Sequence, residues 1–433
     1  MNNVWCGLLA LACAAAIFAT GAAAQEYTLG DLYRQALKNS EKIKYAEENL
    51  FISQMTRKKA WAVLIPKVTA FGTYNRFSEE KFTVTGAVIQ PQESGTWGIR
   101  ADQAFSLSVR ELDALKMSGQ MITKSEYDLD AAKADFLLAV ASAYFDVLRA
   151  KKGLEIAAAN MERLTQYRDS VVKRLKVGDV TKTALLRADG ELSGARADYI
   201  RATNAYKLSR AALTRVTGIE ETFRLKDENG TSPELDRFDA LRQTAFSLRA
   251  DLKSYEMQKM IAEQQVKYAR GAFWPTVGLY AIYNAADQNP ATMSLVRESV
   301  LAGASLNFPF FEGGLRVAEL REAQARERQA RLAYDDLKKN IDVELRGAYL
   351  DLETQQGALT FLEDQLVFAQ DNYNAVLRQY ENGLATSLDV MDANALLLTA
   401  ERNAAEALYG LRLAYLKVRK SSGTLLTFVL DGV

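Results

Sequence analysis

The chain has 433 residues, of which 48% are hydrophobic and 25% are charged, so it holds enough apolar material for a folded core and shows no bias toward disorder. Basic and acidic residues number 54 each, which leaves no basic excess to neutralise phosphates and argues against nucleic acid as a partner. The chain contains no histidine, the commonest general base and metal ligand, so we expect no catalytic residue, cofactor or metal site.

The N-terminal segment 1–24 has the pattern of a secretory signal peptide. It carries no charged side chain, and an apolar run over 8–19 precedes the small residues of 22–24, which are typical of a cleavage site. An alternative is lipid attachment at Cys13. Both cysteines, Cys6 and Cys13, lie in this segment, so the exported chain would contain no disulfide. No later stretch approaches 18 consecutive apolar residues, so the sequence predicts no transmembrane helix.

The remaining sequence consists of two similar halves. Matching residues are 209 positions apart early in each half and 205 positions apart later, over most of the exported chain. The matched pairs include Pro66 and Pro275, Tyr74 and Tyr283, Gly178 and Gly383, and Gly218 and Gly423. Such constant offsets indicate an internal duplication. We predict a first repeat at 25–218, a polar junction at 219–236, a second repeat at 237–423 and a C-terminal tail at 424–433.

Each repeat is expected to end in a long helical hairpin. No proline occurs for 141 residues between Pro91 and Pro233, or for 124 residues after Pro309, and both stretches are rich in strong helix formers. Each stretch is interrupted once, near Gly178 and near Gly383, where glycine can end one helix and a threonine can cap the next. The first arms would hold roughly 65 residues and reach on the order of 100 Å.

The second arms carry an apolar stripe whose spacing alternates between three and four residues. It runs from Leu185 to Leu213 in the first repeat and from Val390 to Val418 in the second. A period of 3.5 residues makes helices supercoil, and the many alanines allow close approach between them. The hairpins are therefore predicted to form a coiled-coil wall.

Short strands are expected between the helices. Two-residue alternation of apolar and polar residues marks strands at about 96–108 and 300–310, and proline-led partners precede them at about 67–77 and 275–284, with loops between. Strands of 9 to 11 residues suffice to cross a bilayer. Four strands cannot close into a barrel, and open edges are not tolerated in lipid, so closure would need copies of the chain.

The sequence resembles the TolC family of outer-membrane efflux and secretion channels over nearly its whole exported length. The resemblance is carried by Ala60-Trp61 through Pro66, by Phe308 through Gly314, and by Tyr380 through Ala393. It implies a mainly α fold with a small β part: a homotrimer with a twelve-strand β-barrel in outer-membrane lipid, continued by an α-helical coiled-coil barrel in the periplasm. It also implies a periplasmic adaptor and an inner-membrane pump as partners.

The resemblance further implies a pore gate at the second hairpin. It places gate residues at Asp389, Asp392 and Tyr380, while an arginine of family gates is replaced by Ala385. Two aspartates three residues apart lie on one helix face, so three chains would present two rings of carboxylates. The turns at Gly178 and Gly383 are, by the same resemblance, where an adaptor would dock.

Simpler interpretations compete with this one. The aspartates could merely cap the first helical turn, Tyr380 could be a packing aromatic, and Asp179 and Lys182 could be solvated loop charges. At the level of function, the alternatives are a periplasmic coiled-coil adaptor or structural protein without a pore, and a hydrolase with paired carboxylates. The first alternative predicts one hairpin and no lipid-facing strands.

Overall fold

The computed structural model describes residues 25–227, 236–292 and 295–431. The predicted signal peptide at 1–24 lies outside these residues, and so do residues 228–235 of the predicted junction. The chain divides into two compact units, each assembled from both sequence halves. We name them the hairpin unit (residues 1–44, 130–249 and 340–433) and the strand unit (residues 45–129 and 250–339).

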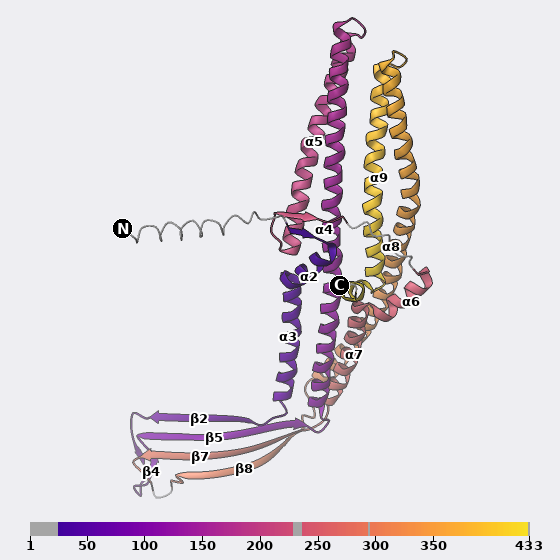
Figure 1. The fold of residues 1–433 in the computed structure, drawn as a ribbon. Helices are drawn as coiled ribbons and strands as arrows, with labels where there is room; N and C mark the ends of the chain where they lie inside the picture. Colours follow the sequence, from indigo (N-terminus) through magenta and orange to yellow (C-terminus); the bar gives the residue numbers. More distant parts are fainter. Residues whose placement is uncertain (1–24, 228–235, 293–294, 432–433) are drawn as a thin grey trace, which may run out of the picture. The chain divides into compact units, whose positions relative to one another are not determined.

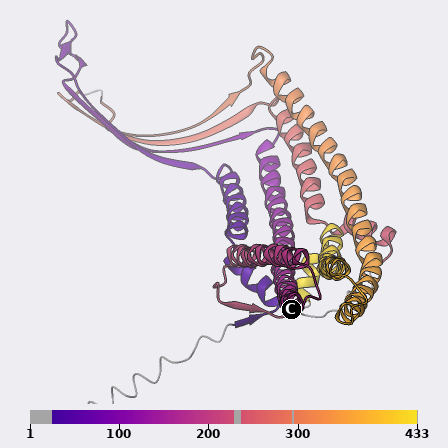
Figure 2. The ribbon, with the colours of Figure 1, turned by 90° about the horizontal axis from the view of Figure 1, so that it is seen from above.

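The strand unit contains a four-stranded antiparallel sheet (Figure 1). Its order is β2-β5-β7-β8, with bounds Lys67–Arg76, Glu93–Ser106, Thr276–Asn289 and Glu298–Asn307. The first two strands come from the first repeat and the last two from the second, and the four strands curve together (Figure 2). A small hairpin of β3 (Lys81–Phe82) and β4 (Val88–Gln90) lies in the loop between β2 and β5.

The sheet contains a strand at each of the four predicted places, but only β2 keeps nearly the expected bounds, and β8 covers Glu298–Asn307 where 300–310 was expected. The two central strands are longer at one end than expected. β7 extends five residues beyond the expected end at 284, and β5 begins three residues before 96. These extensions pair with each other, Glu93 opposite Asn289 and Thr96 opposite Ala286. Hydrogen bonds between strand backbones do not require apolar side chains. The strands can therefore continue beyond the segments in which apolar and polar residues alternate.

The register sorts the side chains of the sheet onto two faces, because residues directly opposite each other point the same way. We define the apolar face by the row through Trp97, which lies opposite Gly72 and Ala285. Its members include Val68, Ala70, Ile99, Phe105, Val277, Leu279, Tyr283, Val300 and Leu306. The polar face carries Lys67, Thr69, Asn75, Thr96, Arg100, Asp102, Asn284, Ser299, Ser305 and Asn307.

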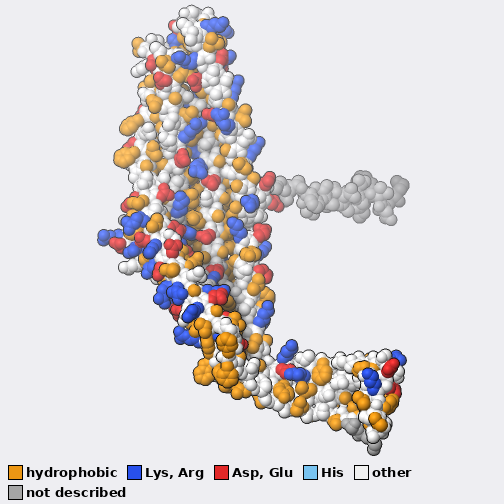
Figure 3. Space-filling view, turned by 180° about the vertical axis from the view of Figure 1, so that it is seen from behind, with side chains coloured by type: hydrophobic (Ala, Val, Ile, Leu, Met, Phe, Trp, Pro, Cys, Tyr) orange, Lys and Arg blue, Asp and Glu red, His pale blue; other side chains and the backbone are white. Residues whose placement is uncertain are grey.

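Away from the loop ends of the strands, the apolar face contains one polar residue. Gln103 lies on it, at the end nearer the helices, and its side-chain amide donates to the carbonyl oxygens of Val63 (3.2 Å) and Ala104 (3.3 Å). Gln103, the polar residue that breaks the alternating pattern, therefore joins β5 by a hydrogen bond to the segment that follows α3 (Glu41–Ala62). Hydrophobic side chains gather where the sheet meets the helices of this unit (Figure 3).

The duplication is visible in the lengths of the helices. α2 (Leu29–Asn39) and α6 (Phe238–Leu248) have 11 residues each, and α3 and α7 (Ala250–Gly271) have 22 each. The long helices α4 (Arg110–Lys176) and α8 (Leu315–Glu381) have 67 each. Their hairpin partners are α5 (Lys182–Thr217) and α9 (Ser387–Ser421). Within the described ranges, none of the helices is long and apolar enough to cross a membrane.

The predicted stripe of the second arms forms part of the core of the hairpin unit. Its buried members are Ala188, Leu192, Ala195 and Leu213 in α5, and Val390, Ala393, Leu397, Ala400, Ala404, Ala407, Ala414 and Val418 in α9. Near the turns, one hydrophobic cluster takes residues from α4, α5, α8 and α9, so the two hairpins share a core. Alanine lets helices pack at short distance, which is why the stripe is rich in it.

Short elements follow the ends of α5 and α9 that lie away from the turns. β1 (Gln25–Tyr27) pairs in parallel with β6 (Phe223–Leu225), which lies in the predicted junction. The predicted tail folds as a short helix, α10 (Leu425–Asp431), whose Leu425 and Val429 are buried. The tail is therefore part of the folded unit.

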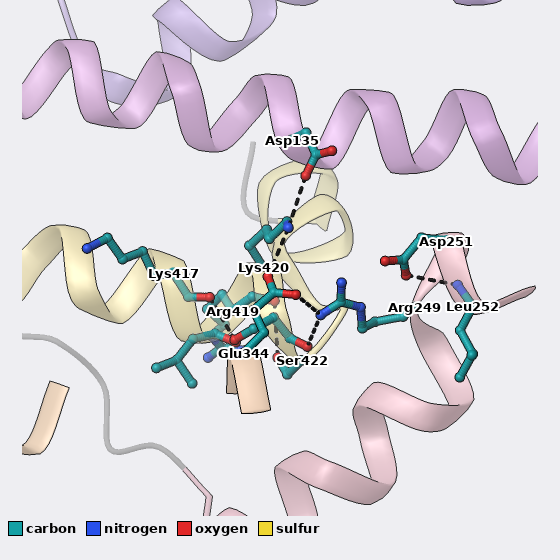
Figure 4. Close-up of polar contacts among 11 residues, drawn as sticks. Asp135, Arg249, Asp251, Leu252, Glu344, Lys417, Arg419, Lys420 and Ser422 are labelled. Carbon is teal, nitrogen blue, oxygen red and sulfur yellow. Dashed lines mark hydrogen bonds and ion pairs between the residues drawn. The ribbon is translucent and has the colours of Figure 1, made fainter. Parts of the chain in front are cut away.

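A charge cluster ties four segments of the hairpin unit together (Figure 4). The ammonium group of Lys420 lies 3.0 Å from Glu344 and 3.1 Å from Asp135. The buried guanidinium of Arg249 contacts Glu344 at 2.8 Å and the carbonyl oxygen of Ser421 at 3.1 Å. Burial opposes the charge of Glu344, but Arg249 and Lys420 outweigh it and hold the pKa of that carboxyl below its usual range.

Replacing Glu344 by Gln should lower the thermal midpoint of the protein at neutral pH, because it removes the charge that Arg249 contacts at 2.8 Å and Lys420 contacts at 3.0 Å. Since the pKa of Glu344 is lowered in the fold, its contribution is present above its unfolded pKa of 4.5 and is lost as the pH falls through the folded pKa. Glu344→Gln should therefore lose less stability between neutral and acidic pH than the wild type. Helical circular dichroism on heating measures this.

The exposed Glu353 on the same helix provides the control, since Glu353→Gln removes the same charge outside the cluster. An acid sensitivity of Glu344→Gln equal to that of the wild type and of Glu353→Gln would contradict the assigned role of this cluster.

Candidate functional site

The two hairpin turns have the same backbone structure. Gly178 and Gly383 have φ angles of 77° and 76°, in the left-handed region that glycine adopts without strain. The amide of Gly383 donates to the carbonyl of Tyr380 (3.0 Å), and that of Leu384 donates to Gln379 (2.8 Å). Gly178 and Asp179 repeat these bonds at the end of α4. Both long helices therefore end in a glycine cap, as the sequence predicts.

A threonine then starts each second arm, and only the second turn completes a capping box. The hydroxyl of Thr386 accepts from the amide of Asp389 (3.3 Å), and the amide and hydroxyl of Thr386 both donate to Asp389 Oδ2 (2.7 Å each). In the first turn, the hydroxyl of Thr181 accepts from the amide of Ala184. The methyl side chain of Ala184 has no oxygen that could accept a hydrogen bond from Thr181, so this turn has no capping box. Asp389 thus stabilises the start of α9.

Asp389 and Asp392 are both exposed at the start of α9. The hydrogen bonds from the backbone and side chain of Thr386 hold the pKa of Asp389 below its usual range, so this carboxylate is charged at neutral pH. Asp392 makes no hydrogen bond or ion pair with other described residues. Residues three apart lie on one side of a helix, so both carboxylates face the same solvent region. Their role as gate residues remains a prediction.

Tyr380 is buried, with 3% of its surface exposed, at the end of α8. Its ring lies 5.4 Å from the ring of Tyr167 on α4, centroid to centroid. The guanidinium of Arg174 stands 4.5 Å from the Tyr380 ring centre and donates to the Tyr380 carbonyl oxygen at 2.6 Å. Arg174 also binds Asp179 at 2.6 Å. Tyr380 therefore packs between the two hairpins of one chain, where it joins their turns.

Sequence reasoning missed the residues of the first hairpin that hold this contact. Tyr167 donates to the hydroxyl of Ser387 at 2.7 Å, and burial raises the pKa of the Tyr167 phenol. Arg174 has Gln379 as its counterpart 205 positions later, so the cation is found in one half only. That departure from the repeat is the signal that could have identified it. Asp179, interpreted as a solvated loop charge, is the partner of Arg174.

Comparison with known proteins identifies the chain. A family model described as outer membrane efflux protein matches residues 32–219 and, a second time, residues 241–424. The chain belongs to this family. The outer membrane protein TolC of Vibrio cholerae is 24% identical over 96% of this chain and 95% of its own length. TolC of Escherichia coli strain K12 is 22% identical over 76% of this chain and 74% of its own.

Solved structures of outer membrane channels have the same fold. The crystal structure of CusC superposes with a TM-score of 0.82 at 19% identity, covering 91% of this chain and 92% of CusC. That of the outer membrane protein VceC from Vibrio cholerae gives 0.78 at 21% identity, covering 91% and 96%. As an outer membrane efflux protein, the chain is an outer-membrane channel subunit for efflux or secretion. Members of the family are channels rather than enzymes.

The packing of Tyr380 generates a test. Its hydroxyl is buried and has no hydrogen-bond partner among the described residues, so Tyr380→Phe should leave the thermal midpoint unchanged or slightly raised. Tyr380→Ala removes the ring from the shared core and should cost about 3 to 5 kcal/mol of unfolding free energy. Thermal or denaturant unfolding of the detergent-extracted protein measures both.

Single-channel conductance of Tyr380→Phe adds a second criterion. An unchanged conductance would agree with a packing role, whereas a large change in Tyr380→Phe would mean that the hydroxyl takes part in a latch and that packing does not explain this residue.

Proposed function

We propose that three copies of the chain close into one twelve-strand barrel in the outer membrane, continued by a helical duct in the periplasm. The observation that carries this proposal is the four-stranded sheet with one apolar and one polar face. Within the described residues, β2 and β8 pair on one side only. Unpaired backbone groups are too costly in lipid to remain open, so each β2 edge needs the β8 edge of another copy.

The distribution of side chains on the apolar face fits outer-membrane lipid. The charged residues of this face are Arg76, Glu93, Asp287 and Glu298, all at the loop ends of the strands. The band between them and the helices contains no charge. Trp97 and Tyr283 pack edge to face at 5.9 Å toward the loop end, as aromatic residues do at membrane interfaces. At the other end, Trp274 and Phe310 are exposed.

The duct needs neither a catalytic residue nor a cofactor, because transport through an open channel involves no bond making. The driving force comes from an inner-membrane pump, reached through a periplasmic adaptor. The names of relatives support operation within a larger system: one is an alkaline protease secretion protein of Pseudomonas aeruginosa and another a cation efflux system protein of Escherichia coli. Which molecule this chain exports is set by those partners.

The hairpin turns are the proposed docking points for the adaptor. Each turn exposes one large apolar side chain, Val177 beside Gly178 and Leu384 beside Gly383, and both are 79% exposed. Apolar side chains held out on a rigid glycine-capped turn are suited to burial by a partner protein. The alternative function, a coiled-coil protein without a pore, leaves the two-faced sheet unexplained.

Asp389 and Asp392 form the proposed gate, as two rings of three carboxylates. At a separation of about 6 Å and an effective dielectric constant near 20, each pair of like charges is unfavourable by ~3 kcal/mol. Such rings attract cations and bind divalent ions. Because Asp389 also caps α9, its removal should lower helix stability by about 1 kcal/mol, whereas removal of Asp392 should not.

The test is single-channel conductance of the detergent-extracted protein in planar bilayers. We expect a trimeric, cation-selective pore whose selectivity and block by divalent ions weaken in the double variant Asp389→Ala with Asp392→Ala. The double variant Glu162→Ala with Glu191→Ala removes two exposed carboxylates from the first hairpin and should conduct like the wild type.

The outcomes separate the parts of this proposal. A monomeric protein that does not conduct and is not recovered from outer membranes would favour a coiled-coil protein without a pore. A trimeric pore whose selectivity is the same with and without the two aspartates would keep the channel and remove the gate from this position.

A further inference from the structure

The polar face of the sheet carries only three charged side chains in the described strands: Lys67, Arg100 and Asp102. Lys67 lies directly opposite Asp102 in the register, and Arg100 is two residues before Asp102 on the same strand. The guanidinium nitrogen Nε of Arg100 lies 2.8 and 2.7 Å from the two carboxylate oxygens of Asp102. The three charges therefore form one cluster.

A tyrosine supports this cluster. Tyr280 lies opposite Asp102, and the guanidinium carbon of Arg100 is 5.7 Å from the centre of its ring. On its other side Tyr280 lies opposite Gly303, where an added Cβ would come within 2.5 Å of the ring. The Tyr280 side chain thus lies over Gly303, with its ring next to the Arg100 guanidinium. A glycine at 303 is required for this placement.

The position of the cluster along the strands, level with the uncharged band of the apolar face, argues against contact with lipid. Arg100 and Asp102 alternate with Ile99 and Ala101, which belong to the uncharged middle band of the apolar face. The charges of the apolar face, by contrast, are confined to the loop ends of the strands. A charged pair at the depth of the hydrocarbon must point to water, and in a closed barrel water is found on the inner side.

We propose that Lys67, Arg100 and Asp102 form a basic ring on the inner wall of the exit barrel, which favours passage of anions and of anionic groups on the exported molecule. This inference rests on the proposed trimer. Two cations and one carboxylate leave one positive charge per chain, and three copies place these charges at one level of the barrel. The ring is opposite in sign to the aspartates of α9.

The radius of a twelve-strand barrel is small enough for a ring of charges on its inner wall to act on ions at the barrel axis. A barrel of twelve strands about 4.8 Å apart and tilted by about 40° has a wall radius of about 12 Å. The charges stand inside that wall, about 10 Å from the axis, which is close to the Debye length of about 8 Å at physiological ionic strength. Three unit charges about 10 Å away change the local concentration of ions of each sign by about fivefold in dilute salt.

The test is the reversal potential of single channels in a salt gradient, in dilute salt and in molar salt, with chloride as the anion. Asp102→Asn adds net positive charge and should raise the anion-to-cation permeability ratio several-fold, whereas Lys67→Gln with Arg100→Gln should lower it several-fold. Both shifts should shrink in molar salt, where the Debye length is about 3 Å. Arg76→Gln removes a cation from the apolar face of β2 and should leave the ratio unchanged.

These measurements are made both in the wild type and in the Asp389→Ala, Asp392→Ala background, in which the acidic rings no longer contribute to selectivity. Conducting channels in which Asp102→Asn and the double basic variant give the same ratio would overturn the basic ring and leave the channel intact. A wild type that does not conduct would count against the proposed function instead.

Thiol labelling supplies a readout that does not need conduction. In proteoliposomes, a water-soluble, membrane-impermeant thiosulfonate should modify Arg100→Cys, whereas the neighbouring Ile99→Cys, on the apolar face, should be protected by lipid. The unsubstituted chain serves as the blank for Cys6 and Cys13. Modification of Ile99→Cys but not of Arg100→Cys would place the charges outside the lumen and refute the ring.

Discussion

The antiparallel pairing of β5 with β7 is the interaction on which the rest of the structure depends. It joins the two repeats through a continuous ladder from Glu93 opposite Asn289 to Ser106 opposite Thr276. Because this ladder has no shift in register, the alternation of one repeat continues into the other, and apolar residues of all four strands reach the same face. The ladder also leaves β2 and β8 at the edges, one from each repeat, as complementary ends of a larger closed sheet.

The two hairpins depend on a different kind of specificity. Alanine-rich stripes let helices approach closely but fit in more than one register, since one small side chain is much like another. Polar contacts beside the stripe select one register. Arg163 of α4 binds both carboxylate oxygens of Glu401 on α9 at 3.0 Å and contacts Asn394 at 3.2 Å, and Asn394 donates to Asn160 at 2.8 Å. A slip by one turn would break all of these bonds at once.

Much of the architecture could be predicted from the sequence, because it follows from periodicity. The duplication, which is confirmed, is a repeated pattern, and the four strands, the glycine turns and the apolar stripe follow from local patterns. The cluster around Arg249 and the contact of Arg174 with Tyr380 could not be predicted, because each depends on which faces of distant helices meet. In the sequence, a buried guanidinium looks like any surface arginine. Asp389 and Asp392 remain predicted gate residues, and a single chain shows only that Asp389 caps α9.

The equal length of α4 and α8 restricts how this protein can vary in evolution. Both helices have 67 residues, and their turns contact each other through Arg174 and Tyr380. Inserting one residue into either helix would move its turn by about 1.5 Å and rotate it by about 100°, and a whole heptad would restore the rotation but leave the turns about 10 Å out of step. Insertions in one hairpin therefore need a matching insertion in the other, so length differences among relatives should accumulate in the strand loops and in the segment between the repeats.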